Sequence, residues 1–425
     1  MGGKMLHQYG EREIPLAESW KRGTEAIAAL GLTAAYTDLG GDPGAWHCQL
    51  HQEDGTPVPS LAGCGKGFGE AAKVGALYEA LEHHLAATVT IEPADVTLRS
   101  AHEISTGPFA PDVSSLLLSA GPDGQVACRS HRAVHGDATC DVPVFVNCPW
   151  YLEDEAQDLR SRLGDHYRYG ALGRYSVNSG CATGASVTEA TVHAVNEVVE
   201  RDAFSLLLIR TFLAPQPAPL TVVDPDTLPQ RLASLLKMTE ERVGAPVVLI
   251  DMTSNIGIPS FMAWSAPQQP GMIRRGCGTS LVSAYAAERA LTELIQCIAV
   301  TSRPGYDHPE RSSLEGYPVL MRCSEMDLRP ALGSGRTVPF TQTPTCGEPE
   351  QYLATLVEQL ARRGHTPYVR PLHTFANGVS VVSVVIPGLE RFALITDGRV
   401  VVPGSRGRQA QRTVPQPAGP HADAA

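Results

Sequence analysis

The chain has 425 residues, 43% of them hydrophobic, so it is long enough for two or three domains or one large composite fold with a real core. It carries 34 basic and 45 acidic residues, a formal net charge of −11. Its basic residues are scattered, and pairs such as Arg274-Arg275 are interpreted as solvated surface, so binding to a nucleic-acid polyanion is disfavoured.

Membrane insertion and structural zinc are also disfavoured. There is no apolar run of 18 residues and no basic-then-apolar N-terminus. The ten cysteines include no CxxC pair and no tight Cys/His cluster, so they are expected to be small buried hydrophobic residues in a reducing, cytoplasmic setting.

The first elements in chain order are a helix and a strand. Apolar periodicity predicts a helix from Leu16 to Leu30, and alternation predicts a strand around Trp46 to Leu50. Residues 1–62 are expected to form a segment packed on the core. A Pro/Gly-rich insertion at about 98–150 has short strand-like runs, such as Val142 to Val146.

Helices and strands alternate in the second half of the chain. A helix is expected around Leu228 to Val243, followed by strands at Val247 to Ile250 and Phe261 to Trp264. A further helix, Glu350 to Arg363, precedes a strand from Val379 to Ile386. The pattern indicates a mixed α/β fold. Residues 404–425 lack apolar periodicity and are expected to be a flexible tail beyond the main domain, 63–403.

Three further helices share one sequence template, anchored on a glutamate. The anchors are Glu79, Glu197 and Glu293, and three residues after them come Glu82, Glu200 and Gln296. Seven residues before the anchors stand Ala72, Ala190 and Ala286, and a glycine-bearing turn is expected before each helix. Positions i and i+3 share one helix face, so each ExxE or ExxQ unit presents two oxygen ligands side by side.

Four carboxylates in one site repel one another, and a hard cation such as Mg²⁺ would relieve that repulsion. The ordinary alternative is a solvated helix face, which three register-matched copies make less favourable. A di-iron site needs a histidine at i+3 of its glutamates, and none is present here.

Cations accompany the same helices. Arg289, Glu293 and Gln296 lie at i, i+4 and i+7, so an arginine able to bind phosphate would face the site. Lys66 stands between glycines ahead of the first helix, as a phosphate-binding residue would. No Walker A or GxGxxG sequence occurs, so ATP would bind without a P-loop.

Taken together, these motifs resemble the YcaO-domain family. Gly65-Lys66-Gly67 through Glu82 resembles its GKG followed by SxxxExxER, and Asn178 through Asp202 resembles NGxAxG followed by ExxERDA. Arg289 through Gln296 resembles RALTExxQ, and Val384 through Glu390 resembles the closing vxVPGLE. Two positions depart from the pattern: Gly75 replaces a serine, and His83 replaces an arginine.

The resemblance implies a YcaO-like fold that binds ATP and Mg²⁺ and activates a peptide-backbone amide. It implies Mg²⁺ ligands at Glu79, Glu82, Glu197 and Glu200, ATP contacts at Lys66, Gly75, Asn178, Arg201, Arg289, Glu293 and Gln296, and catalytic roles for the last three. Attack by a neighbouring Cys, Ser or Thr gives a thiazoline or oxazoline, whereas sulfide gives a thioamide.

The leading hypothesis is a cyclodehydratase that modifies a ribosomally synthesised precursor peptide in natural-product biosynthesis. Thioamidation with a partner protein, and a non-catalytic scaffold suggested by Gly75 and His83, are the alternatives. Expected partners are the peptide, a separate E1-like leader-binding or other partner protein, and a flavin dehydrogenase, with a homodimer left open. Family members often end in PxPxP, whereas Pro415, Pro417 and Pro420 give PxPxxP here.

Overall fold

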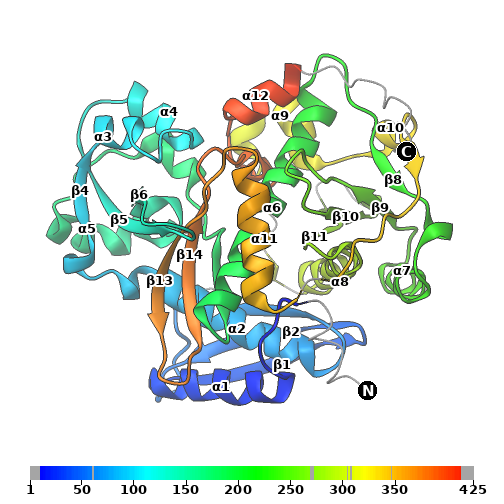
Figure 1. Ribbon diagram of the computed structural model, residues 1–425, viewed down its shortest axis with the longest axis horizontal. Coiled ribbons are helices and arrows are strands. Elements are labelled where there is room, and N and C mark those ends of the chain that lie inside the picture. Colours follow the sequence, from blue (N-terminus) through cyan, green and yellow to red (C-terminus); the bar gives the residue numbers. More distant parts are fainter. Residues whose placement is uncertain are drawn as a thin grey trace.

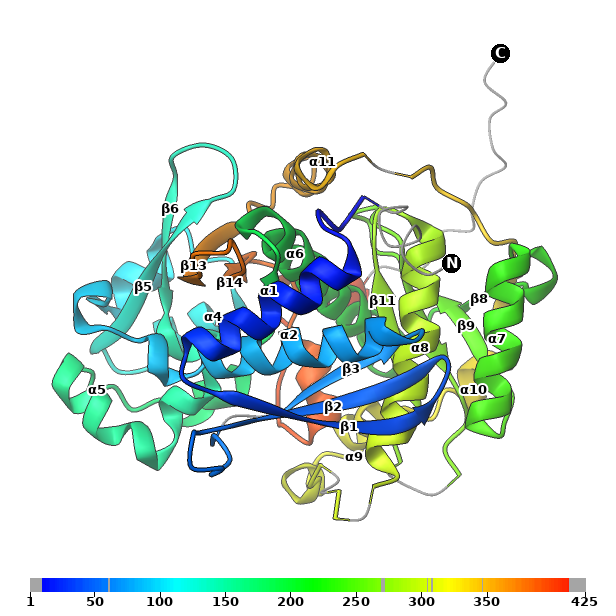
Figure 2. The same cartoon turned by 90° about the horizontal axis from the view of Figure 1, so that it is seen from below.

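The computed structural model describes residues 10–59, 62–268, 272–303, 305–306, 309–345 and 347–412. Their strands form three separate sheets, with helices α2, α6 and α8 near the centre (Figures 1 and 2). The predicted mixed α/β class is confirmed. No helix in these ranges is long and apolar enough to cross a membrane, and the nine cysteines within them are free thiols, seven of them buried.

The first sheet is antiparallel and belongs to the N-terminal part of the chain. Its strands, in spatial order, are β1 (Thr33–Gly41), β2 (Gly44–His51) and β3 (Gly63–Gly67). Helix α2 (Glu70–Ala86) packs on β2 and β3 and buries Leu77 and Leu81, while α1 (Leu16–Ala29) packs against α2. The predicted first helix and first strand are therefore confirmed.

The second sheet joins distant parts of the chain. Its strand order is β4 (Thr97–Ser100), β5 (Gln125–Ala133), β13 (Tyr368–Thr374), β14 (Ser380–Val385) and β7 (Cys181–Gly184), with β6 (Thr139–Pro143) paired to β5. The Pro/Gly-rich stretch thus contributes strands to a sheet that the C-terminal hairpin completes. The strand-like run Val142 to Val146 was only partly right, because β6 ends at Pro143 and a 3-10 turn follows.

Three short helices accompany this second sheet. They are α3 (Ala101–Thr106), α4 (Val113–Ala120) and α5 (Gln157–Leu163). Of these, α3 packs on β4 and α4 packs on α3. Helix α6 (Val187–Leu208) packs on β7 and β14, and α11 (Pro349–Ala361) packs on α6. The predicted helix Glu350 to Arg363 and the strand Val379 to Ile386 are confirmed within two residues.

The third sheet has the order β11 (Arg275–Thr279), β10 (Ser260–Trp264), β9 (Val248–Asp251), β8 (Thr221–Val223) and β12 (Arg336–Val338). Helix α8 (Ser283–Thr301) packs on β11 and β10, and α7 (Gln230–Val243) packs on α8. Helices α9 (Pro318–Glu325) and α10 (Arg329–Leu332) follow. The predicted α7, β9 and β10 are confirmed, whereas β12 was not predicted.

The recurring glycines and alanines have one packing function. A Cβ on Gly65 would lie 1.7 Å from the carbonyl oxygen of Ala72, and one on Gly278 would lie 2.1 Å from that of Ala286. Only glycine lets these strands approach their helices so closely. Most of these glycines lie inside β3, β7 and β11, so the prediction that they form turns was wrong.

The predicted flexible tail begins with a helix instead. Helix α12 (Ser405–Arg412) is held by Arg406, whose guanidinium donates two hydrogen bonds, of 2.8 and 2.9 Å, to the fully buried carboxylate of Asp202. The carboxylate of Glu390 accepts hydrogen bonds from the backbone of Gly404 and Gly407. The tail prediction is wrong for this segment, and the PxPxxP sequence lies outside the described residues.

Candidate nucleotide and metal site

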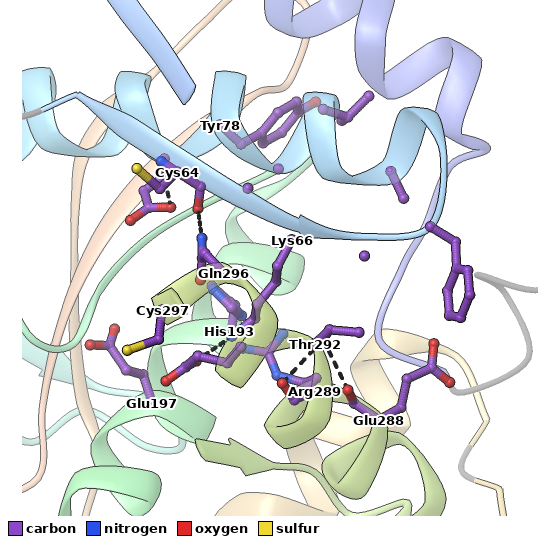
Figure 3. A pocket seen from close by; sticks show the side chains of 18 of the residues that line it. Cys64, Lys66, Tyr78, His193, Glu197, Glu288, Arg289, Thr292, Gln296 and Cys297 are labelled. Atoms are coloured by element: carbon purple, nitrogen blue, oxygen red, sulfur yellow. Dashed lines mark hydrogen bonds and ion pairs between the residues drawn. The ribbon is translucent and has the colours of Figure 1, made fainter. Parts of the chain in front are cut away.

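One cavity of about 1500 Å³ brings together every residue that the sequence nominated for the site. Strand β3 and helices α2, α6, α7 and α8 form its walls. Its lining includes Lys66, Gly75, Glu79, Glu82, Asn178, Glu197, Glu200, Arg201, Arg289, Glu293 and Gln296. Figure 3 shows Lys66 extending from its strand toward the helices that carry His193 and Arg289.

Each anchor glutamate is tied to the segment that precedes its own helix. The backbone N–H groups of Cys64, Gly180 and Cys277 donate to Glu79, Glu197 and Glu293 over 3.1, 3.4 and 3.1 Å. One oxygen of each anchor is therefore held by the fold, which fixes where the rest of the carboxylate lies. The sequence showed the register of the anchors but not this backbone contact.

The carboxylates of α2 and α6 are only partly balanced by cations of the protein. Burial raises the pKa of Glu79 to about 7, although the Cys64 backbone hydrogen bond and the charge of Lys66 oppose it; repulsion from Glu197 and Glu293 adds less. Burial and the charges of Glu197 and Glu79 raise the pKa of Glu82 well above its usual value. Burial also raises the pKa of Glu197, and burial with the charge of Glu293 raises that of Glu200. A bound cation would relieve this repulsion.

Glu293 differs from these four because its pKa is lowered, not raised. Its carboxylate is paired with the ammonium group of Lys66. Burial alone would raise the pKa of Glu293, but Lys66 and Arg201 outweigh it and lower the pKa to about 2. Arg201 lies 3.7 Å from Glu197 and 4.0 Å from Glu200, so it also offsets part of the charge on α6.

The carboxylates line the cavity as two helix pairs and do not form a closed cage. Within the described ranges, no three His, Cys, Asp or Glu side chains converge into a group ready to hold a metal ion. Mg²⁺ usually takes one or two carboxylates together with water and substrate phosphates. The donor set therefore fits a magnesium ion that is held jointly with a phosphate ligand.

Arg289 has an unused donor, whereas the amide of Gln296 is engaged with the backbone. The Nε atom of Arg289 is buried without a hydrogen-bond partner among the described residues, and its guanidinium lies 5.9 Å from the ring centre of Tyr285. Burial and the charge of Arg289 lower the pKa of His193 well below its usual value, so this imidazole is neutral. The amide of Gln296 donates to the carbonyl oxygen of Cys64, which ties α8 to β3.

Comparison with known proteins identifies the family. Residues 64–390 match the family model described as the YcaO cyclodehydratase, which binds ATP and Mg²⁺. The chain belongs to the YcaO family. The cofactors predicted from the sequence, ATP and Mg²⁺, are those of this family.

Two YcaO relatives have descriptions that name no activity. A protein of Rhizobium leguminosarum bv. trifolii, described as an uncharacterized protein in the tfuA 3′ region, is 28% identical over 77% of this chain and 76% of its own length. An uncharacterized protein of Methanothermobacter thermautotrophicus is 27% identical over 76% of this chain and 80% of its own.

Several solved structures, one of them a YcaO protein, share the fold. YcaO from Methanopyrus kandleri, bound with AMPPCP and Mg²⁺, matches with a TM-score of 0.62 and 22% identity over 92% of this chain and 94% of its own. A heterocyclase in complex with substrate and cofactor matches with a TM-score of 0.59 and 18% identity, over 90% of this chain and 53% of the other. The Escherichia coli microcin synthetase McbBCD complex matches with a TM-score of 0.55 and 12% identity, over 84% of this chain and 88% of its own.

The two departures from the YcaO pattern lie at the same wall of the cavity. A Cβ on Gly75 would meet the Cα of Gly65 at 3.4 Å, an ordinary contact, so the backbone leaves space for a side chain. The Nδ1 atom of His83 lies 3.1 Å from the carbonyl oxygen of Ala62, and its Nε2 lies 3.8 Å from Glu79. Neither departure closes the cavity.

Two arginines of the cavity were missed by sequence reasoning. Arg12 reaches it from the N-terminal segment and pairs with Glu189 at 2.9 Å. Arg275 also lines it, while Arg274 is buried and donates to the carbonyl oxygen of Val243 at 2.6 Å. The interpretation of Arg274-Arg275 as solvated surface was therefore wrong. Their position directly before Gly276-Cys277-Gly278, at the start of β11, was the available signal.

Proposed function

We propose that this YcaO-family chain uses ATP and Mg²⁺ to activate backbone amides of a peptide and to cyclise Cys, Ser or Thr residues to thiazolines or oxazolines. The observation that carries the proposal is that one cavity holds both buried carboxylates and cations that face them. Burial, together with repulsion between the carboxylates, raises the pKa values of Glu82 and Glu200. That distribution suits a magnesium–phosphate ligand, which brings positive charge to the acids and negative charge to Lys66, Arg201 and Arg289.

In this proposal the acidic residues of the cavity would bind the metal ion, and the basic residues would bind phosphate. Glu79, Glu82, Glu197 and Glu200 would hold the metal, with Glu79 and Glu197 oriented by their backbone contacts. Arg289 would donate to phosphate oxygens through its unpaired nitrogen, and Lys66 would share its charge between Glu293 and the phosphate. Such fixed donors stabilise developing negative charge because they need no reorganisation.

The chemistry balances with ATP as the only co-reactant. The nucleophile of the peptide side chain adds to the carbonyl carbon and loses its proton, and the former amide oxygen takes the phosphoryl group as ADP leaves. ATP thus supplies the group that makes this oxygen able to depart. Loss of phosphate with the amide proton then forms the C=N bond, so one ring costs one ATP and the peptide loses the mass of one water.

The size of the cavity supports a second substrate beside the nucleotide. Pockets for a single small ligand usually measure about 300–1,000 Å³. The cavity of about 1500 Å³ exceeds that range, which leaves room for a peptide segment next to a nucleotide. Delivery of that peptide by a separate leader-binding or other partner protein, and oxidation of the ring by a flavin dehydrogenase, remain part of the proposal.

Thioamidation is the second candidate function, with sulfide in place of the side-chain nucleophile. It needs a partner protein, and one YcaO relative is described by its place beside tfuA, a neighbouring gene. A non-catalytic scaffold is less well supported, because Gly75 and His83 leave the cavity open and its cations and carboxylates in place.

The test is a reaction of the chain with Mg-ATP, the peptide encoded beside it and its partner protein, followed by intact-mass spectrometry. Loss of one water per ring with matching ADP release supports azoline formation. Sulfide-dependent exchange of oxygen for sulfur would identify a thioamidating enzyme instead. If the peptide stays unmodified and no Mg-ATP binding is measurable, the result would favour the non-catalytic scaffold.

A further inference from the structure

A second cavity, of about 280 Å³, adjoins the main one behind helix α6. Its walls come from α6, the segment 177–179, the segment 386–391 and the 3-10 helix Phe392–Asp397. Both cavities are lined by Asn178, Glu197, Arg201, Arg275, Glu293 and Asp397. A group seated in the side cavity would therefore touch the residues around the proposed magnesium–phosphate site.

The lining of the side cavity mixes polar and apolar side chains. All six residues shared with the main cavity are polar or charged, whereas seven of the other eleven are apolar. The apolar residues of the side cavity include Val198, Phe204, Leu389, Ala393 and Leu394. Glu390 also borders it, but this carboxylate accepts hydrogen bonds from the backbone of Gly404 at 2.8 Å and Gly407 at 2.6 Å. The cavity is at the small end of ligand pockets, so it suits one amino-acid side chain better than a nucleotide.

Arg275 stands where the two cavities meet and has donor capacity left. Its guanidinium lies 4.3 Å from the ring centre of Phe204, and Nη2 donates to the hydroxyl of Thr396 at 3.3 Å. Nε is buried without a hydrogen-bond partner, and no carboxylate among the described residues forms an ion pair with this arginine. Arg275 is half-buried, and its buried N–H without a partner needs an acceptor oxygen.

We propose that the side cavity binds the peptide residue next to the activated amide, with an apolar side chain in the cavity and Arg275 donating to a backbone carbonyl oxygen. The inference rests on the proposed function, because it assigns that function's substrate class and a residue that positions it. An acidic side chain is disfavoured in the apolar part of the cavity, because Glu390 borders it and Arg391 is already paired with Asp112 at 3.2 Å. Burial of an unpaired charge there would be costly.

The test uses short peptides of the form acetyl-Gly-Xaa-Cys-Gly-amide, with Xaa as Gly, Asp, Leu or Phe. Binding to the full chain with Mg-AMPPCP is measured by NMR, and turnover with Mg-ATP is followed in parallel. We expect Leu and Phe peptides to bind at least about tenfold more tightly than Gly or Asp peptides, because a pocket gains roughly tenfold or more from filling apolar space.

Two variants separate pocket recognition from loss of folding. Ala393→Phe fills the cavity and should abolish the preference for Leu and Phe peptides while leaving Mg-AMPPCP affinity unchanged. Leu389→Ala enlarges it and should shift the preference from Leu toward Phe, a gain that misfolding cannot produce. Arg275→Lys keeps the charge but loses the guanidinium geometry, and should weaken all four peptides alike.

The outcomes also distinguish the inference from the proposed function. Selective peptide binding that the cavity variants alter, without any turnover, would support the side cavity and contradict the cyclodehydratase. Turnover with no dependence on Xaa, or with an unchanged preference in both cavity variants, would overturn the side-cavity proposal and leave the cyclodehydratase standing. Equal binding of all peptides without turnover would overturn both.

Discussion

Lys66 and Glu293 form an ion pair between strand β3 and helix α8, although 227 residues separate them in the chain. The pair explains why Glu293 alone among the site glutamates has a lowered pKa, of about 2. One turn further along α8, Gln296 donates to the carbonyl oxygen of Cys64 on the same strand. These two contacts hold β3 against α8 along one side of the cavity.

Lys66→Met should raise the KM for Mg-ATP by at least about tenfold, because one cation that faces the phosphates is lost. It should also raise the pKa of Glu293, which loses its main neutralising partner. A double-mutant cycle with Glu293→Gln, read by chemical denaturation, should give a coupling of about 0.5–3 kcal/mol. Lys21→Met on the exposed face of α1 is the matched control, and zero coupling would contradict the pairing.

Glu82→Gln and Glu200→Gln should change activity and stability in opposite directions. Each removes a proposed metal ligand, so Mg-dependent ATP turnover should fall by about 10²–10³-fold, as for other lost electrostatic contacts. Each also removes a repelled carboxylate, so the melting temperature of the metal-free chain should rise. Glu241→Gln, on the exposed side of α7, should alter neither. Full activity in both site variants would show that Glu82 and Glu200 are not metal ligands.

The metal-free chain should lose stability as pH rises toward and through about 7. The folded-state pKa of Glu79 is raised from 4.5 to about 7, so the folded chain binds this proton more tightly than the unfolded chain does. That stabilisation is complete below pH 4.5 and is lost as pH rises through the folded pKa. Melting curves between pH 5 and pH 8 measure it, and Glu79→Gln should flatten the trend.

Magnesium binding should have the opposite pH dependence, because a metal ligand must first lose its proton. The shift in melting temperature caused by Mg-ATP should therefore be larger at about pH 8 than at about pH 6, spanning the folded pKa of Glu79. In Glu79→Gln that difference should shrink. An equal shift at both pH values in the unaltered chain would show that Glu79 is not a ligand.

The variants Gly75→Ser and Gly75→Ala test the effect of the serine hydroxyl that the YcaO pattern has at this position. Both should stabilise the chain by about 0.5–1 kcal/mol, because glycine inside a helix is unfavourable and a Cβ fits at 3.4 Å from Gly65. Only the serine variant should lower the KM for Mg-ATP, by a few-fold. Identical kinetics in the two variants would mean that the hydroxyl has no function in this chain.

Arg406→Met should destabilise the chain by about 3–5 kcal/mol, since it leaves the fully buried carboxylate of Asp202 without its cation. Helix α12 should detach, which amide hydrogen exchange over residues 405–412 would detect. Arg412→Met, in the exposed last position of the same helix, is the control and should have little effect. A small loss of stability with α12 still protected would contradict the anchoring role of Arg406.

The sequence by itself determined the local features. Apolar periodicity placed α1, α7 and α11 within two residues of their observed bounds, because a helix with one buried face repeats every three to four residues. The ExxE and ExxQ registers nominated six site residues, the family resemblance extended the set to eleven, and all eleven line one cavity. Side chains at i and i+3 share a face whatever the rest of the fold does, so this grouping could be read without a structure.

Only the tertiary structure decided which distant residues meet. The pairing of Lys66 with Glu293, the docking of Arg406 on Asp202 and the place of Arg275 between two cavities depend on contacts across about 70 to 230 positions. No local periodicity encodes such contacts, which explains why Arg275 was mistaken for surface and residues 405–412 for a flexible tail. The packing function of the glycines in β3 and β11 likewise became clear only from the structure, which places them against Ala72 and Ala286. Close packing depends on two segments and cannot be derived from one of them alone.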